Sequence, residues 1–299
     1  MPADKALKLP SYGGQAVMEG VLMRGKHNVA MAVRASSGEI VTHQEQLPPL
    51  YSSNWMKIPF IRGMISLWDS LNLGTRLLTK SANIATGEDE PLEGTALFFT
   101  VLLSLALSIG LFFVLPAFLA GLIERYLEIS SWWSNLIEGL IRLFILIGYL
   151  FIMGRIPDIR RVFAFHGAEH KTVNAFEANA ELTPEIVSQY TLVHPRCGTS
   201  FMLTLVFISV LVFTLLGPLP LHIRIISRIL MLPIVSGIAY EYIRFAANKM
   251  DTSAFVRWLI QPNLWLQKLT TREPSLDMLE VSITAFNLML QGENQANQI

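Results

Sequence analysis

One stretch of thirty residues, 94–123, carries no charged side chain and constrains the chain more than any other feature. A helix needs about 20 apolar residues to cross the hydrocarbon core of a bilayer. This stretch is long enough to cross at a tilt, even with Pro116 near its end. Composition agrees, because 52% of the 299 residues are hydrophobic and only 15% are charged, against about 25% charged in an average soluble domain. We therefore expect an integral membrane protein with substantial polar parts.

Three further apolar runs follow at 136–154, 201–221 and about 225–247. Glu138 and Arg142 lie one turn apart near the start of the first of them, where they can pair at i,i+4 or extend towards the headgroups. Four spans are the economical count, and the predicted fold class is an α-helical polytopic membrane protein with about four transmembrane helices.

The basic residues predict the orientation of these spans. Nine Lys or Arg lie in residues 1–93, five in the 155–200 loop and four after residue 247, whereas the 124–135 connection has one. Because cytoplasmic loops carry the excess of Lys and Arg, we expect both termini and the 155–200 loop in the cytoplasm. The equal totals of 23 basic and 23 acidic residues give no case for a polyanion binder, and specific DNA binding is not expected.

The polar parts divide the chain further. Residues 1–58 contain the alternating runs "NVAMAVR" and "EIVTHQEQL" around "ASSG", which predict a small N-terminal β-hairpin unit with "QAVMEGVLMR" as a third strand. Residues 59–93 read as an amphipathic helix and an acidic linker. The four-span membrane domain is 94–247, and 248–299 is a tail of short helices split by prolines. The opening residues are polar, with no secretory signal.

The helix expected at 59–84 has one apolar stripe. This stripe would suit the membrane surface, or it would cover the core of the β unit, and the sequence leaves both possibilities open. Its members are Phe60, Ile61, Met64, Ile65, Trp68, Leu71 and Leu78.

The strongest chemical signal is "FHGAEHKTVNAFE" in the 155–200 loop. On a helix His166 and His170 share one face and Glu169 flanks it, the arrangement in which two imidazoles bind one divalent ion and a carboxylate moves protons. This is the H-x-x-E-H spacing of inverted zincins. Asn174 and Glu177 continue the same face.

A second cluster, "HPRCGTS", brings His194, Arg196 and Cys197. Four of the seven His and Cys residues thus fall within 32 positions, and the 178–193 segment is long enough to bring the clusters together. We expect a bound divalent ion, zinc in the first place, while a metal-free polar network and incidental placement stay open. All four side chains would form a closed structural set. Catalysis requires one of them, Cys197 in our interpretation, to stay off the ion.

Other polar residues stand out by their surroundings. "GGQAVMEGVLMRG" is either a functional loop or a plain strand, and Glu241 in the last span pairs with Arg244 unless it has a functional role. "LTTREPS" reads as a helix cap. The site candidates from these segments are Gln15, Glu19, Arg24, Glu241, Arg272 and Glu273.

These motifs, in this order, resemble the YqhQ-like family of bacterial polytopic membrane proteins, over nearly the whole chain from Gly13 to beyond Glu280. The resemblance implies a multi-pass protein of the bacterial cytoplasmic (inner) membrane and a predicted metal-dependent enzyme. It marks His166, Glu169, His170, His194 and Cys197 as the matching site positions, without a role for any of them.

Two functions follow from these observations. The first is a membrane-embedded metal-dependent enzyme, a hydrolase at the cytoplasmic face, with Glu169 as the base that takes a proton from water. The second is a non-enzymatic scaffold or insertion factor that binds membrane lipids, the translocation machinery, a ribosome or nascent membrane proteins, with the His/Cys cluster as a structural clamp. The chain has no P-loop, Rossmann or G-x-S-x-G motif, which disfavours nucleotide-driven transport and serine hydrolysis.

Overall fold

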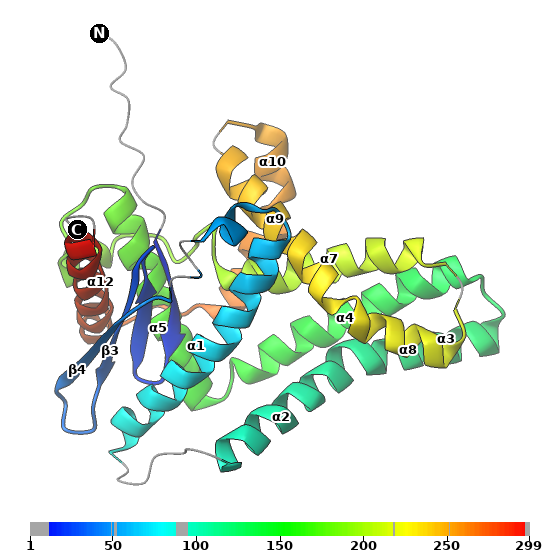
Figure 1. The fold of residues 1–299 in the computed structure, drawn as a ribbon, viewed down its shortest axis with the longest axis horizontal. Coiled ribbons are helices and arrows are strands. Elements are labelled where there is room, and N and C mark those ends of the chain that lie inside the picture. Colours follow the sequence, from blue (N-terminus) through cyan, green and yellow to red (C-terminus); the bar gives the residue numbers. More distant parts are fainter. Residues whose placement is uncertain are drawn as a thin grey trace.

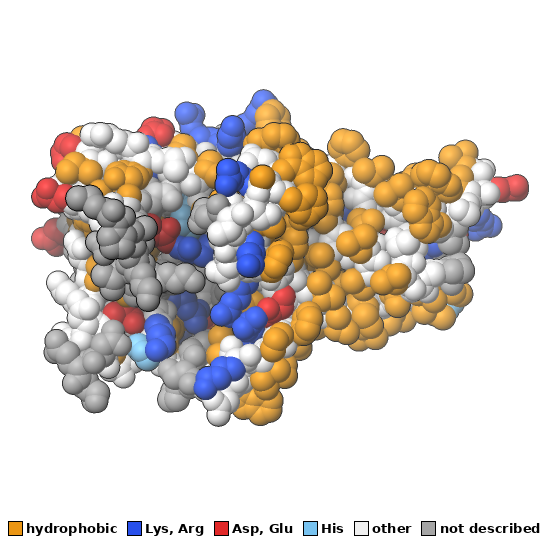
Figure 2. Space-filling model, turned by 90° about the horizontal axis from the view of Figure 1, so that it is seen from above, with side chains coloured by type: hydrophobic (Ala, Val, Ile, Leu, Met, Phe, Trp, Pro, Cys, Tyr) orange, Lys and Arg blue, Asp and Glu red, His pale blue; other side chains and the backbone are white. Residues whose placement is uncertain are grey.

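The computed structural model describes residues 12–48, 50, 53–87, 95–217, 219–250 and 252–296. It has a polar body, which contains a small sheet, and an apolar arm of helices that extends from the body (Figure 1). Apolar side chains cover the arm, and Lys and Arg gather where it meets the body (Figure 2). The polar N-terminus at 1–11 and most of the acidic linker, 88–94, lie outside the described residues.

The sheet is a four-stranded antiparallel meander in the order β1-β2-β3-β4. The expected hairpin is present, but "QAVMEGVLMR" forms two strands because it reverses at Met18 and Glu19. Glu19 adopts a positive φ of 51°, and its carbonyl accepts a hydrogen bond from the Arg34 N–H. The turn has neither Gly nor Asn at these two positions, so turn chemistry gave no signal for it. The strands are β1 (Gly13–Val17), β2 (Gly20–Arg24), β3 (Asn28–Arg34) and β4 (Ile40–Gln46).

Helices cover both faces of the sheet. On one face Val21, Met23, Ala30 and Ala32 pack against α5 (Pro157–Glu177) and α12 (Leu276–Ala296). On the other face the alternate residues pack against α1 (Ile61–Thr86). The sheet, the 155–200 loop and the C-terminal tail therefore share one hydrophobic core, which crosses the divisions drawn from the sequence.

Helix α1 buries a different face from the predicted stripe. Leu73 and Leu77 contact the sheet, whereas Met64, Trp68 and Leu78 of the stripe are exposed, Trp68 by 70%. The helix thus covers the core of the β unit and still presents much of its apolar stripe outward.

The apolar arm contains fewer clear spans than the four that we predicted. Among the described residues, Phe98–Leu127 and Trp132–Met153 are long and apolar enough to cross a membrane. A third would be the pair α8 (Leu221–Leu230) and α9 (Leu232–Lys249), which is bent by 48° where one helix follows the other. Helix α7 (Gly198–Leu215) is apolar but short. Two or three helices therefore qualify, and four are not established.

The remaining bounds complete the arm and the tail. The first arm helix contains a π-helical turn, η3, and the tail begins with two short helices. The elements are η2 (Asn54–Lys57), α2 (Thr95–Ile109), η3 (Gly110–Val114), α3 (Leu115–Leu127), α4 (Ser131–Met153), α6 (Pro184–Val187), α10 (Ala254–Leu259) and α11 (Gln261–Thr270).

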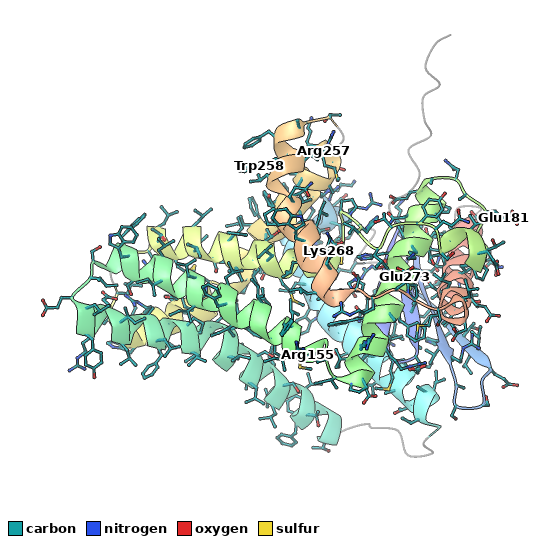
Figure 3. All side chains as sticks on the ribbon, turned by 180° about the vertical axis from the view of Figure 1, so that it is seen from behind. Arg155, Glu181, Arg257, Trp258, Lys268 and Glu273 are labelled. Carbon is teal, nitrogen blue, oxygen red and sulfur yellow. The ribbon has the colours of Figure 1, made fainter. Side chains whose placement is uncertain are left out.

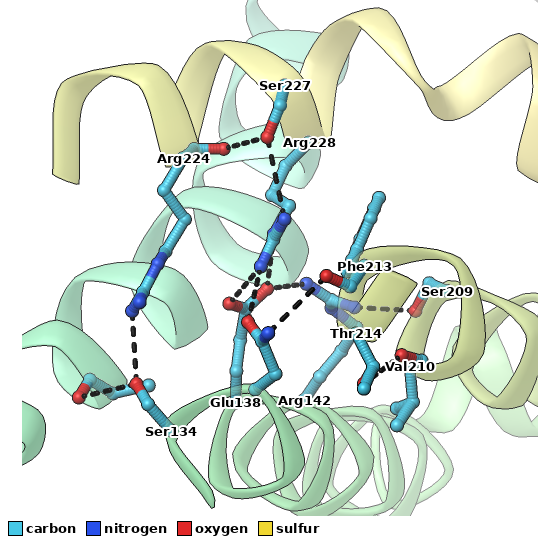
Figure 4. Close-up of polar contacts among 12 residues, drawn as sticks. Ser134, Glu138, Arg142, Ser209, Val210, Phe213, Thr214, Arg224, Ser227 and Arg228 are labelled. Atoms are coloured by element: carbon cyan, nitrogen blue, oxygen red, sulfur yellow. Dashed lines mark hydrogen bonds and ion pairs between the residues drawn. The ribbon is translucent and has the colours of Figure 1, made fainter. Parts of the chain in front are cut away.

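A buried ion network holds the arm together (Figure 4). Glu138 and Arg142 pair at 2.7 Å along α4, as the spacing predicted, and Arg228 of α8 joins the same carboxylate at 2.9 Å. Arg142 also donates to Ser209 Oγ of α7 at 2.6 Å and to the carbonyl of Phe112 in the π turn at 2.8 Å. One carboxylate therefore neutralises part of two fully buried guanidinium charges and links the helices that carry them.

Glu138→Ala is expected to destabilise the arm by about 3–5 kcal/mol, because it leaves two buried guanidinium groups without their carboxylate. Replacing the whole set with Glu138→Leu, Arg142→Met and Arg228→Met should restore most of the loss, since apolar residues of similar volume remove the need for pairing. Thermal unfolding of the purified full chain measures both, with the exposed Glu181→Ala as control. A single variant as stable as the control would contradict the role of the network.

Candidate functional site

The H-x-x-E-H segment lies on α5, whose residues 164–175 are largely buried. Pro157 begins the helix, where its missing N–H costs nothing. The backbone carbonyl of Arg272 lies directly against Gly167, where any Cβ would collide with it. Glycine at 167 thus lets the 270–273 segment approach, and the histidine face points into the protein.

The segment after α5 brings the second cluster back to the first. Asn174 Nδ2 donates to the carbonyls of Thr191 at 2.9 Å and Val193 at 3.1 Å. Gln267 of α11 accepts from the His194 N–H at 3.0 Å and donates to its carbonyl at 2.8 Å. Ligand atoms of His166, His170 and Cys197 consequently lie within 4.8 Å of one another.

Backbone carbonyls fix the orientation of two imidazoles. His166 Nδ1 lies 2.9 Å from the Thr270 carbonyl, and His170 Nδ1 lies 2.5 Å from the Leu192 carbonyl. A carbonyl only accepts, so we assign the proton of each ring to Nδ1. Each Nε2 then carries a free lone pair, which is how metal-binding histidines are usually held. His166 Nε2 faces Cys197 Sγ at 3.1 Å.

His170 Nε2 is a buried nitrogen with no hydrogen-bond partner among the described residues. Burying such a group without a partner costs about 1–3 kcal/mol, and native proteins retain few of them. Two imidazole nitrogens and a thiolate form a donor set that zinc favours. The residues present therefore fit a divalent ion.

His194 lies beside the three ligand candidates and outside their group. Its ring centroid is 5.8 Å from that of His170, and its buried Nε2 is 3.6 Å from Glu177 Oε2 with no hydrogen-bond partner among the described residues. Burial lowers the pKa of His194, although the charge of Glu169 opposes the shift. The group of ligand atoms within 4.8 Å therefore contains Cys197, which the sequence interpretation left off the ion, and does not contain His194.

Glu169 lies next to the ligand candidates. The residue is 4% exposed, and its Oε2 lies 3.5 Å from His170 Nε2. A Cβ on Gly14 of β1 would lie 2.8 Å from Glu169 Cγ, so glycine allows the strand to pass close to this carboxylate. Gly14 therefore helps to give β1 its place beside the site.

A cavity of about 370 Å³ joins the two motifs. Gln15 and Arg24 of the segment "GGQAVMEGVLMRG" line it together with Glu169 of α5 and with residues of the "HPRCGTS" cluster. The lining residues are Gly13, Gly14, Gln15, Leu22, Arg24, Gly25, Leu73, Gly74, Glu169, His194, Arg196, Cys197 and Gly198.

Both arginines at the cavity are held by carboxylates. Arg24 pairs with Asp69 of α1, and Arg196 pairs with Glu177. Asp69 was missed in the sequence because it lies opposite the apolar stripe, where a solvated position is expected, yet it is buried. Two more residues missed there, Gln267 and Thr270, act on the histidines from α11, and no spacing in the sequence links them to α5.

The other sequence candidates lie away from the cavity lining. Glu19 pairs with Arg161 at 2.5 Å, and Glu273 pairs with Lys171 at 2.5 Å. Glu241 pairs with Arg62 of α1, at 2.6 Å to its Nε, in place of the expected Arg244.

Arg272 caps α11, in agreement with the sequence interpretation. Its guanidinium donates to the carbonyls of Lys268 at 3.0 Å and Thr271 at 2.8 Å near the end of that helix.

Comparisons with known proteins find relatives of this chain by sequence. A family model described as "Protein of unknown function (DUF1385)" matches residues 58–292. The chain is 35% identical over 306 residues to the uncharacterized protein YqhQ of Bacillus subtilis (strain 168), covering 97% of this chain and 95% of the relative. No solved structure matches.

Removing one candidate residue at a time should show whether His194 binds the ion together with His166, His170 and Cys197. His170→Ala and Cys197→Ala are expected to abolish stoichiometric zinc in the purified full chain, because each removes a donor atom of the group. His194→Ala should lower affinity by no more than about 10–100-fold, the usual effect of a residue next to the ligands. Zinc content after equilibration against a chelator measures this, and equal loss in all three variants would indicate a closed four-ligand site.

Proposed function

This chain belongs to the DUF1385 family, and from the geometry of its site we propose that it is a membrane-bound, metal-dependent hydrolase. The observation that carries the proposal is the buried Nε2 of His170, which has no hydrogen-bond partner among the described residues and lies beside His166 and Cys197. Glu169 and Cys197 also line the 370 Å³ cavity. Three protein ligands leave a coordination position open, as in catalytic sites, whereas structural zinc sites are closed by four.

Each residue of the site would have a separate role in hydrolysis. An ion held by His166, His170 and Cys197, zinc in the first place, would act as a Lewis acid towards the bond to be cleaved. Glu169 takes a proton from the attacking water as the water oxygen bonds to the electrophilic carbon or phosphorus. The bond to the leaving group then breaks, and Glu169 returns the proton to that group. Thr270 and the Leu192 carbonyl keep the imidazoles in the required tautomer.

The second candidate function is the scaffold or insertion factor. The observation that favours it is the exposed apolar stripe of α1, where Met64, Trp68 and Leu78 face outward. Membrane lipids, the translocation machinery, a ribosome or a nascent membrane protein would meet that stripe, and the His/Cys cluster would stabilise the body. This function requires no base at position 169.

We also propose that the arm crosses the bacterial cytoplasmic membrane four times with both termini in the cytoplasm. The shared core supports this, because the strands, α5 and α12 pack together and must lie on one side of any membrane. The Lys and Arg at the border of the body agree with that side being cytoplasmic (Figure 2). Helix α7, with 18 residues, is about 27 Å long, and would cross with local thinning of the bilayer.

Glu169→Gln should leave zinc content and membrane abundance unchanged and lower turnover by about 10²–10⁴-fold, because it preserves size and hydrogen bonding but removes the base. Complementation of a deletion phenotype, with zinc and abundance measured alongside, provides the test. The control is Glu181→Gln, an exposed glutamate outside the lining of either cavity. A fully functional Glu169→Gln protein would reject the hydrolase and favour the scaffold.

Single cysteines at the exposed positions 37, 178 and 275 should resist an impermeant thiol reagent in intact cells, and one at position 130 between α3 and α4 should react. The parent protein, with its buried Cys197, gives the background. Labelling of position 37, 178 or 275 from outside would overturn the proposed topology.

A further inference from the structure

A second cavity, of about 480 Å³, lies where the arm joins the body. Arg155, at the end of α4, and Glu273, before α12, both border it and lie at this junction in Figure 3. Its other charged lining residues are Arg160, Arg161 and Arg272, and Pro157, Ala164 and Met278 supply the apolar part. Four guanidinium groups and one carboxylate therefore surround one hollow.

The carboxylates nearby neutralise little of this charge. Glu273 already pairs with Lys171 at 2.5 Å, and Arg161 already pairs with Glu19. Among the described residues, Arg155, Arg160 and Arg272 have no ion pair with a carboxylate. Three uncompensated charges remain around the cavity, and their mutual repulsion falls when an anion occupies it.

Two side chains are already positioned without any anion. The Arg155 guanidinium stacks over the Phe151 ring with 4.1 Å to the ring centroid, and Arg272 is held by the carbonyls at the end of α11. Prior ordering of this kind reduces the entropy that binding would otherwise cost. Planar guanidinium forks match the oxygens of a phosphate in a bidentate manner, which ammonium groups do not.

The cavity lies next to the end of a helix that can cross a membrane, which points to one source of such an anion. Arg155 follows Trp132–Met153, one of the helices that can cross a membrane, by two residues. Basic pockets at the cytoplasmic ends of spans meet the anionic headgroups of the inner leaflet. We propose that this cavity binds a phosphate group, carried by the headgroup of an anionic phospholipid or by a soluble phosphate ester. The site is separate from the 370 Å³ cavity that Glu169 and His194 line, and it does not depend on hydrolysis.

The test compares two double variants of the full chain. Arg155→Gln with Arg160→Gln removes two exposed charges from the cavity, and Lys57→Gln with Lys249→Gln removes two exposed charges elsewhere. Each protein is reconstituted in nanodiscs of phosphatidylcholine and phosphatidylglycerol, then extracted into neutral detergent, and the retained phosphatidylglycerol is counted. A parallel arm titrates detergent-solubilised protein with glycerol 3-phosphate.

The wild type and the lysine control should retain phosphatidylglycerol, and the arginine double variant should bind it at least about tenfold more weakly, since one lost ionic hydrogen bond is worth about that factor. Tenfold weaker binding of glycerol 3-phosphate, with no retained lipid in any protein, would support the soluble source. The proposal fails if neither probe binds the wild type, or if both double variants lose binding equally. Unchanged thermal unfolding without a probe shows that the variants are folded.

Discussion

The burial of α5 between the sheet and α12 is the constraint on which the rest of the body depends. Phe165 and Ala168 on one side of the helix are buried in the core that α5 forms with β1, β2 and α12. Burying an aromatic side chain contributes about 1.5–3 kcal/mol. Once this face is fixed, the helical repeat sends the opposite face, with His166 and His170, towards the 191–197 segment and α11. The core thus determines the direction in which the histidines point.

The local part of this arrangement could be predicted from the sequence, and the long-range part could not. The i,i+4 spacing placed His166 and His170 on one face because helix geometry is local, and the same rule gave the Glu138–Arg142 pair. Glu241 pairs with Arg62 because α1 packs against α9, which no local rule reveals. The face of α1 that packs on the sheet could not be predicted for the same reason. Periodicity identifies an apolar face, but it cannot tell which neighbour covers that face.

The arm is held together by a buried network of charged side chains, whereas the core of the body is apolar. Glu138 carries one negative charge between Arg142 and Arg228, so the three side chains retain one net positive charge. The ring of Phe213 lies 4.1 Å from the Arg228 guanidinium and 5.3 Å from that of Arg142, which offsets part of this charge through the π face. Apolar residues would pack the arm at lower electrostatic cost, whereas the directional bonds of this network link α4 to α7, to α8 and to the π turn.

Helix α11 connects the arm to the candidate site. Leu266 packs into the core of the arm with Leu146 and Leu203, while the next residue, Gln267, holds the backbone of His194. The carbonyl of Thr270 then orients His166, and Arg272 lines the second cavity, between the arm and the body. Because these contacts lie within two turns of one helix and its end, a shift of α11 against the arm moves the carbonyl that sets the His166 tautomer. The geometry of the histidines therefore depends on the packing of the arm as well as on that of the body.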